Sequence, residues 1–413
     1  MNVKFFYARD MDEITRNAVQ SMNESPVNYA ERENVSKFIG ERIITDVTRA
    51  YPNYGAACAN EINSVPNDYG LKLDFNFGLR LDVPPGKYHV KISDSYTGGI
   101  FFDADISATR LMSFEKYYIR WKVEVSTKSK VIFSHKMELA EKNVLLAFQN
   151  VELDELMALI PYVKDFQEHY NCRVSVFLSE KYRQLFALFY PDIPQEAEIS
   201  YRHYATFYPM FSFSDVLFLP FECRTEPMER IGGAILGLSR QPKKLKFNPI
   251  VSRPIAEPYV CIATNTSKKN RAWLYPNGWS AVINYLRQLG YRVVGVDENF
   301  LVESANFLHY AEFFIGLSDG LAWLADAVNC PVVMIGGFTQ NWFEFYTRYR
   351  IANRLLCSGC FNDPRVIFRN QSCPYYADTP RELECQKKIS PRQVINTIER
   401  LIIEKNLKVP ALS

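Results

Sequence analysis

The sequence has no long apolar run, no block of like charge and little histidine, and each absence argues against a class of protein. The most apolar stretches, such as Pro331 to Ile335, are far shorter than a membrane span. The first ten residues become charged before a signal-peptide core forms, so we expect a cytoplasmic protein. The 48 Lys and Arg residues nearly balance the 46 Asp and Glu residues, which argues against a nucleic-acid partner or a membrane surface. The five histidines form no metal-site or catalytic-triad spacing.

The length of 413 residues and the hydrophobic fraction of 47% predict a globular protein of two or three domains. Residues 1–69 are expected to form an N-terminal extension. Within it, apolar residues between Val35 and Val47 recur at helical spacing, which predicts one amphipathic helix. In residues 70–142 apolar residues recur at every second position, as in Ile119 to Val125. A Pro-Pro-Gly turn in this region precedes another segment with the same alternation. This region is expected to form a small antiparallel β domain.

From residue 143 onward, candidate strands and helices take turns, which is typical of a parallel sheet covered on both faces. A segment rich in Pro, Lys and Arg (241–258) interrupts the pattern, so we place an N-terminal lobe at 143–250 and a C-terminal lobe at 251–413. The strands expected are 144–148, 173–178, 215–219, 259–264, 291–296, 313–315 and 332–335. The helices expected are 155–169, 181–190, 279–289, 302–310, 321–328 and 391–407. Two doubly wound lobes of this kind bind a ligand between the carboxyl ends of their strands.

Four of the nine cysteines are clustered near the C-terminus, in one excursion between the last expected strand and the last helix. Cys357 and Cys360 form a C-x2-C pair, and Cys373 and Cys385 follow at loop-length intervals. This spacing is typical of tetrahedral thiolate coordination by one structural metal ion, either zinc or iron, with no position open for catalysis. The alternative is four reduced thiols without a ligand. The other five cysteines are scattered and are expected to be ordinary thiols.

Two loops that follow expected strands carry candidate ligand-binding groups. The first contains hydroxyls and cations suited to a diphosphate: Thr264, Ser267, Lys268, Lys269, Arg271 and the neighbouring Trp273. The second, Ser318-Asp319-Gly320, enters a helix, and its glycine would let a backbone amide approach a ligand. The structural alternatives are a solvated basic loop for the first and a well-capped helix for the second. Asp154 and Glu155 are candidate general bases, unless they merely favour the start of a helix.

Taken together, these segments resemble the bacterial autotransporter heptosyltransferases of the TibC type. The resemblance spans roughly residues 70–405 and includes Phe75-Asn76-Phe77-Gly78, the segment 258–264, Gly278-Trp279-Ser280, the turn at Gly320 and the four cysteines. It implies a GT-B pair of lobes, an ADP-heptose donor and inverting transfer to serine hydroxyls of an autotransporter passenger. It also implies iron(III) held by the cysteines, no catalytic metal and a large homo-oligomer.

Three departures from the family's pattern affect the expected active site. The family carries Gly-Asp ahead of a Pro-Tyr helix, and the matching pair here is Asp154-Glu155, so the resemblance puts Glu155 at the base position. Arg271 stands where the family has a lysine, and the segment from Glu298 to Glu312 is shorter than its counterpart. These departures favour the rival interpretation of a catalytically silent homologue that acts as an assembly or substrate-binding subunit. A nucleic-acid-binding protein with a zinc ribbon is a third reading, which the balanced charge disfavours.

Overall fold

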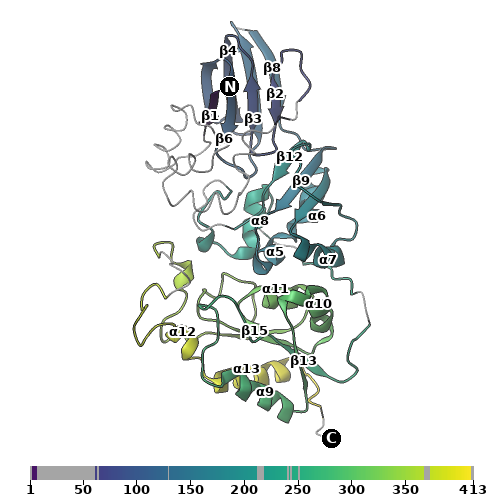
Figure 1. Ribbon diagram of the computed structural model, residues 1–413, viewed down its shortest axis with the longest axis vertical. Helices are drawn as coiled ribbons and strands as arrows, with labels where there is room; N and C mark the ends of the chain where they lie inside the picture. Colours follow the sequence, from purple (N-terminus) through teal and green to yellow (C-terminus); the bar gives the residue numbers. More distant parts are fainter. Residues whose placement is uncertain are drawn as a thin grey trace.

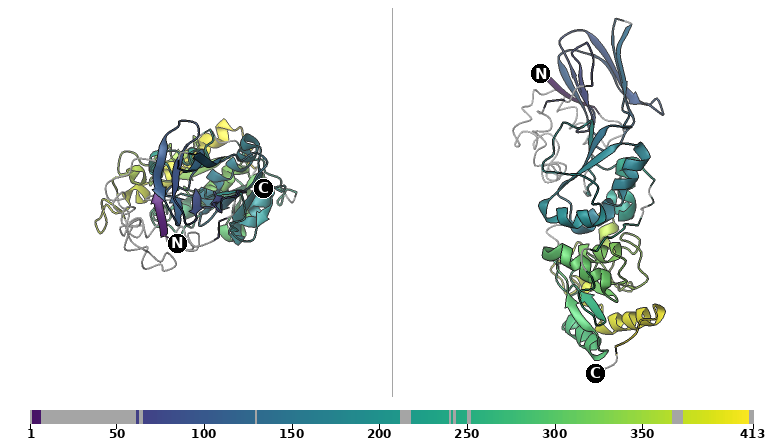
Figure 2. Two further views of the ribbon diagram at one scale, coloured as in Figure 1. Left: turned by 90° about the horizontal axis from the view of Figure 1, so that it is seen from above. Right: turned by 90° about the vertical axis from the view of Figure 1, so that its right-hand side faces the viewer.

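The computed structural model describes residues 2–6, 61–62, 65–128, 130–211, 218–239, 241, 244–249, 252–366 and 373–410. Three regions follow one another along the long axis of the molecule: a β domain, a first α/β lobe and a second α/β lobe (Figures 1 and 2). The helix expected between Val35 and Val47 lies outside the described residues.

The β domain consists of two four-stranded sheets. One has the order β1-β6-β3-β2 and the other β5-β4-β7-β8. Their strands are β1 (Asn2–Phe6), β2 (Lys72–Asp74), β3 (Arg80–Val83), β4 (Tyr88–Asp94), β5 (Ile100–Ile106), β6 (Thr109–Ser113), β7 (Trp121–Thr127) and β8 (Lys130–Lys136). Trp121, Val123 and Val125 are buried while the residues between them are partly exposed, as the period of two predicts. All pairings are antiparallel except that of β1 with β6.

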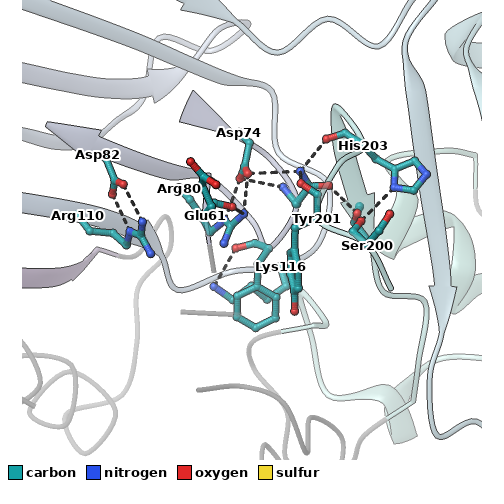
Figure 3. A network of polar contacts seen from close by, with 12 residues as sticks. Glu61, Asp74, Arg80, Asp82, Arg110, Lys116, Ser200, Tyr201 and His203 are labelled. Atoms are coloured by element: carbon teal, nitrogen blue, oxygen red, sulfur yellow. Dashed lines mark hydrogen bonds and ion pairs between the residues drawn. The ribbon is translucent and has the colours of Figure 1, made fainter. Parts of the chain in front are cut away.

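A buried polar network joins the β domain to the first lobe (Figure 3). Asn76 lies after β2, and its Nδ2 donates to the carbonyl oxygens of Tyr201 (3.1 Å) and His203 (2.6 Å). Arg80 of β3 forms a two-pronged ion pair with Asp74, with Nε–Oδ1 at 2.8 Å and Nη2–Oδ2 at 2.6 Å. Because a buried amide or charge is costly without partners, these contacts fix one arrangement of the junction.

The first lobe contains a parallel sheet of order β11-β10-β9-β12, and its described residues include four α-helices and one 3-10 helix. Its elements are β9 (Asn143–Phe148), α5 (Leu153–Leu159), α6 (Tyr162–Tyr170), β10 (Arg173–Leu178), α7 (Glu180–Phe189), β11 (Gln195–Glu196), β12 (Ala205–Phe207), η1 (Cys223–Thr225) and α8 (Met228–Leu236). The prediction of one helix over 155–169 was wrong. The chain forms two helices because Pro161, the N-cap of α6, has no N–H with which to continue α5.

The strand expected at 215–219 falls largely outside the described residues, since only positions 218 and 219 are described and they are not in a strand. The fourth described strand of this sheet is instead β12, which pairs with β9.

The second lobe contains a five-stranded parallel sheet of order β14-β13-β15-β16-β17. Its elements are β13 (Tyr259–Ile262), α9 (Gly278–Gln288), β14 (Arg292–Gly295), η2 (Glu298–Phe300), α10 (Leu301–Tyr310), β15 (Phe314–Leu317), α11 (Gly320–Ala327), β16 (Val332–Ile335), β17 (Arg350–Ile351), η3 (Cys360–Asn362), α12 (Glu384–Lys387) and α13 (Pro391–Glu404). The molecule is therefore an α/β protein with two parallel sheets, as expected, and a β domain that is antiparallel apart from the pairing of β1 with β6. Helices α5 and α11 pack against each other where the two lobes meet.

Candidate functional site

The first-lobe side of the candidate site is the start of α5. Glu152 is the N-cap, and a reciprocal capping box joins it to Glu155: the Glu155 Oε2 accepts the Glu152 backbone N–H at 2.9 Å. Asp154, in the same first turn, is buried with 3% of its surface exposed. The alternative reading of Glu155 as a helix-stabilising residue therefore has a specific structural basis.

Asp154 makes an ion pair with the cationic loop of the second lobe. Arg271 Nη1 lies 2.6 Å from Asp154 Oδ2 and also donates to the carbonyl oxygen of Ser318 at 2.9 Å. Lys268 Nζ lies 4.0 Å from Asp154 Oδ1. The structure thus brings together residues that are 117 positions apart in the chain, and it places one candidate carboxylate directly against the candidate diphosphate-binding arginine.

The two adjacent carboxylates have pKa values that are displaced in opposite directions. Burial opposes the ionised form of Asp154, but the positive charges of Arg271 and Lys268 outweigh it and hold the pKa of Asp154 below its usual value. Burial, followed by the negative charge of Asp154, raises the pKa of Glu155 to about 8. The surroundings of the pair therefore favour the ionised form of Asp154 and shift Glu155 towards its protonated form.

The turn before α11 contacts the cationic loop, because the Ser318 carbonyl oxygen accepts from Arg271. Ser318 is buried, and its Oγ donates to Glu344 Oε1 at 2.6 Å. Glu344 also accepts from Thr339 Oγ1 at 2.7 Å and pairs with Arg350 at 2.5 Å. Burial raises the pKa of Asp319 to about 7, and its buried Oδ1 has no hydrogen-bond partner among the described residues. A buried acceptor left without a donor is a group that a ligand hydroxyl could satisfy.

Gly320 has a close neighbour that the sequence did not predict. A Cβ added at Gly320 would lie 2.5 Å from Leu153 Cβ and 2.8 Å from Leu153 Cγ. The glycine therefore permits α11 to approach α5 across the lobe boundary. Its expected approach to a ligand remains a prediction.

The other predicted donor-binding residues occupy different environments. Ser267 is exposed and Thr264 is partly exposed at the rim of the cationic loop. Trp273 is buried in the second lobe, where its Nε1 donates to the Ile389 carbonyl oxygen at 2.8 Å and its ring packs edge-on against Trp279. The structure thus gives Trp273 a place in the core.

Sequence reasoning missed three residues near this site. Glu344 orders Ser318, as described above. Glu298 of η2 and Tyr182 of α7 both interact electrostatically with Asp154, and burial raises the pKa of Tyr182. The Tyr182 hydroxyl is buried without a partner among the described residues. Glu298 and Tyr182 could have been identified from the sequence, because each follows the carboxyl end of a parallel strand, where ligands bind.

The four clustered cysteines lie together in the segment between β16 and α13, as predicted. Cys360, Cys373 and Cys385 are buried and Cys357 is partly buried. Burial, then the three other thiols, raises the pKa of Cys360 to about 12, and every pair among the four thiols interacts electrostatically. Within the described part of the chain, however, no three His, Cys, Asp or Glu side chains are arranged to hold a metal ion as they stand. The donor set is that of a thiolate metal site, while its geometry is not.

None of the helices in the described ranges is both long and apolar enough to cross a membrane.

Comparison with protein families and curated proteins gives consistent matches. Residues 67–129 match the family model described as glycosyltransferase TibC, N-terminal domain. The autotransporter heptosyltransferase Aah of Escherichia coli is 34% identical over 373 residues, which cover 83% of this chain and 95% of that protein. The inactive autotransporter heptosyltransferase BimC of Burkholderia thailandensis is 30% identical over 364 residues, covering 80% of this chain and 86% of that protein.

Comparison with solved structures gives a fold match of the same extent. The iron-containing dodecameric glycosyltransferase TibC from enterotoxigenic E. coli superimposes with a TM-score of 0.78 at 31% identity, covering 84% of this chain and 99% of that one. A second structure of TibC, in complex with ADP-D-β-D-heptose, matches equally well.

Proposed function

The chain belongs to the family of bacterial autotransporter heptosyltransferases, and we propose that it transfers heptose from ADP-heptose to serine hydroxyls of an autotransporter passenger, with inversion at the anomeric carbon. The observation that carries this proposal is the meeting of Asp154 and Glu155 with Arg271 and Lys268 between the two lobes. A base for the acceptor proton and a cationic group for the leaving diphosphate are the two requirements of such a reaction. The two α/β lobes with parallel sheets support the GT-B arrangement that we propose.

Glu155 is the proposed base. As the serine Oγ bonds to the anomeric carbon, its proton passes to Glu155, and the bond from that carbon to the diphosphate oxygen breaks, with the electron pair leaving on ADP. A base works best when its pKa is near the working pH, and burial together with the charge of Asp154 raises the pKa of Glu155 to about 8. Asp154 has a lowered pKa and contributes its fixed negative charge.

The proposed donor site consists of the cationic loop and the turn before α11. Arg271 and Lys268 balance the charge of the leaving ADP, which removes the need for a catalytic metal. Thr264 and Ser267 contribute hydroxyls. The Asp319 Oδ1, which has no hydrogen-bond partner among the described residues, accepts from a sugar hydroxyl. The proposed role of Gly320 is to bring backbone amides of the first turn of α11 near the donor.

A silent homologue that serves as an assembly or substrate-binding subunit is the second candidate function. The Glu155 carboxylate already stabilises the start of α5, and Arg271 is already paired with Asp154. Similarity to a relative named inactive shows that this family includes such members. The full set of paired acidic and cationic groups between the lobes favours the transferase.

We propose that Cys357, Cys360, Cys373 and Cys385 hold one structural metal ion. Iron is favoured over zinc because the solved relative of matching fold is iron-containing. When bound, the metal supplies no reaction chemistry and crosslinks the segment between β16 and α13. That relative is also dodecameric, which supports a large homo-oligomer here. We also propose a cytoplasmic location.

The test combines calorimetry with ADP and ADP-heptose and a mass measurement of heptose on a purified autotransporter passenger. The transferase predicts binding of both nucleotides and a mass increase of one or more heptose units. Binding without turnover would favour the silent homologue. Absence of nucleotide binding would overturn the proposed donor site.

A further inference from the structure

Arg224 lies in η1, in the first-lobe segment that leads into α8, and it is the centre of a dense set of hydrogen bonds. It is 4% exposed. Two of its N–H groups bind the adjacent Glu222: Nε donates to Oε1 at 3.0 Å and Nη2 to Oε2 at 3.1 Å. This fork fixes the plane of the guanidinium group and directs its outer N–H groups away from η1.

Those outer N–H groups bind the backbone of the cysteine-bearing segment of the second lobe. Nη1 donates to the carbonyl oxygens of Val366 (2.9 Å) and Asp363 (3.3 Å), and Nη2 donates to that of Pro364 (3.0 Å). In return, Asn362 Nδ2 donates to the Arg224 carbonyl oxygen at 2.8 Å. The five N–H groups of one arginine thus have five acceptors, three of them in the other lobe.

The segment that Arg224 binds begins at the cysteine cluster. Cys360 opens η3, and Asn362 closes it, so the contact with Arg224 is two residues from a candidate metal ligand. Phe361, between them, packs against Phe343 with ring centroids 5.0 Å apart. The conformation of the cysteine-bearing segment therefore determines where the carbonyl groups of Asp363, Pro364 and Val366 lie.

The other side of Arg224 leads to the candidate base. Cys223 precedes it and lies close enough to Glu155 for the two groups to interact electrostatically. Helix α8 follows η1 and packs against α5, the helix that carries Glu155. The backbone N–H of Met228, the first residue of α8, donates to the Phe343 carbonyl oxygen at 2.8 Å, which forms a second link to the same part of the second lobe.

We propose that Arg224 is a positioning residue that couples the cysteine cluster to the active-site end of α5, so that the folded cluster holds the two lobes in the arrangement needed for donor binding and transfer. The catalytic part of this inference rests on the proposed function; the coupling itself is a property of the fold. A lysine at this position cannot reproduce the coupling because an ammonium group has three donors and no planar fork.

The experiment compares Arg224→Lys with wild type and with Arg365→Ala. Arg365 is the matched control, since its side chain is 87% exposed and its ion pair is with Asp363 of the same segment. Metal content, hydrogen exchange of α5, ADP affinity and the separate values of kcat and KM are measured. Arg224→Lys is expected to retain its metal, to exchange faster in α5 and to lose about tenfold in ADP affinity, a typical size for coupling between sites. Arg365→Ala should match wild type in all of them.

Removal of the metal with a chelator provides the reciprocal test. Exchange in α5 should increase in wild type and change little in Arg224→Lys, in which the coupling is already broken. Equal exchange in α5 for Arg224→Lys and wild type, or no response of wild-type α5 to the chelator, would overturn the proposal. These exchange results do not depend on turnover, so a failure of the proposed transferase function is recognised separately.

Asn362→Asp guards against the possibility that Arg224→Lys fails to fold. It keeps the Oδ1 that accepts from the Gln340 N–H at 2.7 Å and removes the donor to the Arg224 carbonyl oxygen. A smaller increase in α5 exchange, with metal retained, is the expected result, and wild-type exchange in this variant would count against the coupling.

Discussion

Replacement of Arg271 by alanine tests the buried ion pair and the donor site together. Asp154 is 3% exposed and Arg271 8% exposed, with Oδ2 and Nη1 2.6 Å apart. Removing the arginine leaves a carboxylate charge buried without its main partner, which costs roughly 3–5 kcal/mol of unfolding free energy. Loss of a charge-assisted contact to the diphosphate, worth about 1.5–3 kcal/mol, should weaken ADP binding about ten- to a hundredfold.

Asp154→Asn should strengthen ADP binding, whereas Arg271→Ala should weaken it. These opposite directions distinguish the proposal from a general loss of folding. In the ligand-free protein Arg271 is held by Asp154, so the diphosphate must displace that carboxylate. Neutralising Asp154 releases the arginine, and ADP affinity should increase about tenfold, which corresponds to about 1.4 kcal/mol. The double variant Asp154→Asn/Arg271→Ala should regain most of the stability lost in Arg271→Ala, because no unpaired charge remains buried.

Urea unfolding and calorimetry with ADP are the measurements. Arg348→Ala serves as the control, since its side chain is 63% exposed and its ion pair with Glu404 should contribute less than about 1 kcal/mol. The reasoning would be refuted if Arg271→Ala lost no more stability than this control, or if Asp154→Asn bound ADP more weakly than wild type.

The pH dependence of Asp154 has a definite sign. Its pKa is lowered in the folded protein, so its contribution is present above the unfolded pKa and is lost as the pH falls through the folded value. The acid-side loss of stability should therefore be smaller in Asp154→Asn.

Three further predictions concern the base, the cysteines and the lobe boundary. Glu155→Gln preserves the helix cap and removes basicity, so turnover should fall on the order of a hundredfold. In urea unfolding, wild type should lose stability as the pH rises from the unfolded pKa of Glu155 through about 8, and this loss should be smaller in Glu155→Gln. Cys357→Ser should reduce the metal found by elemental analysis from one ion per chain towards none, and full metal content would contradict the cluster. Gly320→Ala meets Leu153 Cβ at 2.5 Å and should cost about 1–3 kcal/mol in thermal unfolding, whereas Gly295→Ala, with nothing within 4 Å, should be nearly neutral.

The alternation of the two lobes could be predicted from sequence because buried parallel strands are short apolar runs. The strand expected at 173–178 is β10, and the one expected at 332–335 is β16. Where the signal was weaker, the prediction failed. Strand β12 has only three residues, Ala205–Phe207, in a segment rich in aromatic residues, and β17 has two. The break at Pro161 was readable, since a proline inside a helical pattern ends the helix.

The sequence predicted which loops carry the candidate site residues, but it did not predict which of those residues contact one another. Strand ends locate the cationic loop and the turn before α11, because ligands of parallel sheets lie at that edge. The contact between Asp154 and Arg271 depends on how two lobes close, and no local pattern encodes that. The network of Ser318, Thr339 and Glu344 was missed for the same reason: Glu344 lies in a loop without periodicity, and only the fold brings it to Ser318.

The two carboxylates of α5, Asp154 and Glu155, are expected to respond differently when the donor binds. As long as Arg271 is paired with Asp154, the positive charge that a diphosphate needs is already neutralised, and the negative charge of Asp154 opposes an incoming anion. A donor that binds here must separate the pair, and the phosphate charge then replaces Asp154 as the partner of Arg271. The neighbouring Glu155 would then lie beside an Asp154 that has lost its main counter-charge, which raises the pKa of Glu155 further. Only the ionised form of Glu155 can take the serine proton, so turnover of the donor-bound protein should increase as the pH rises through the pKa of Glu155.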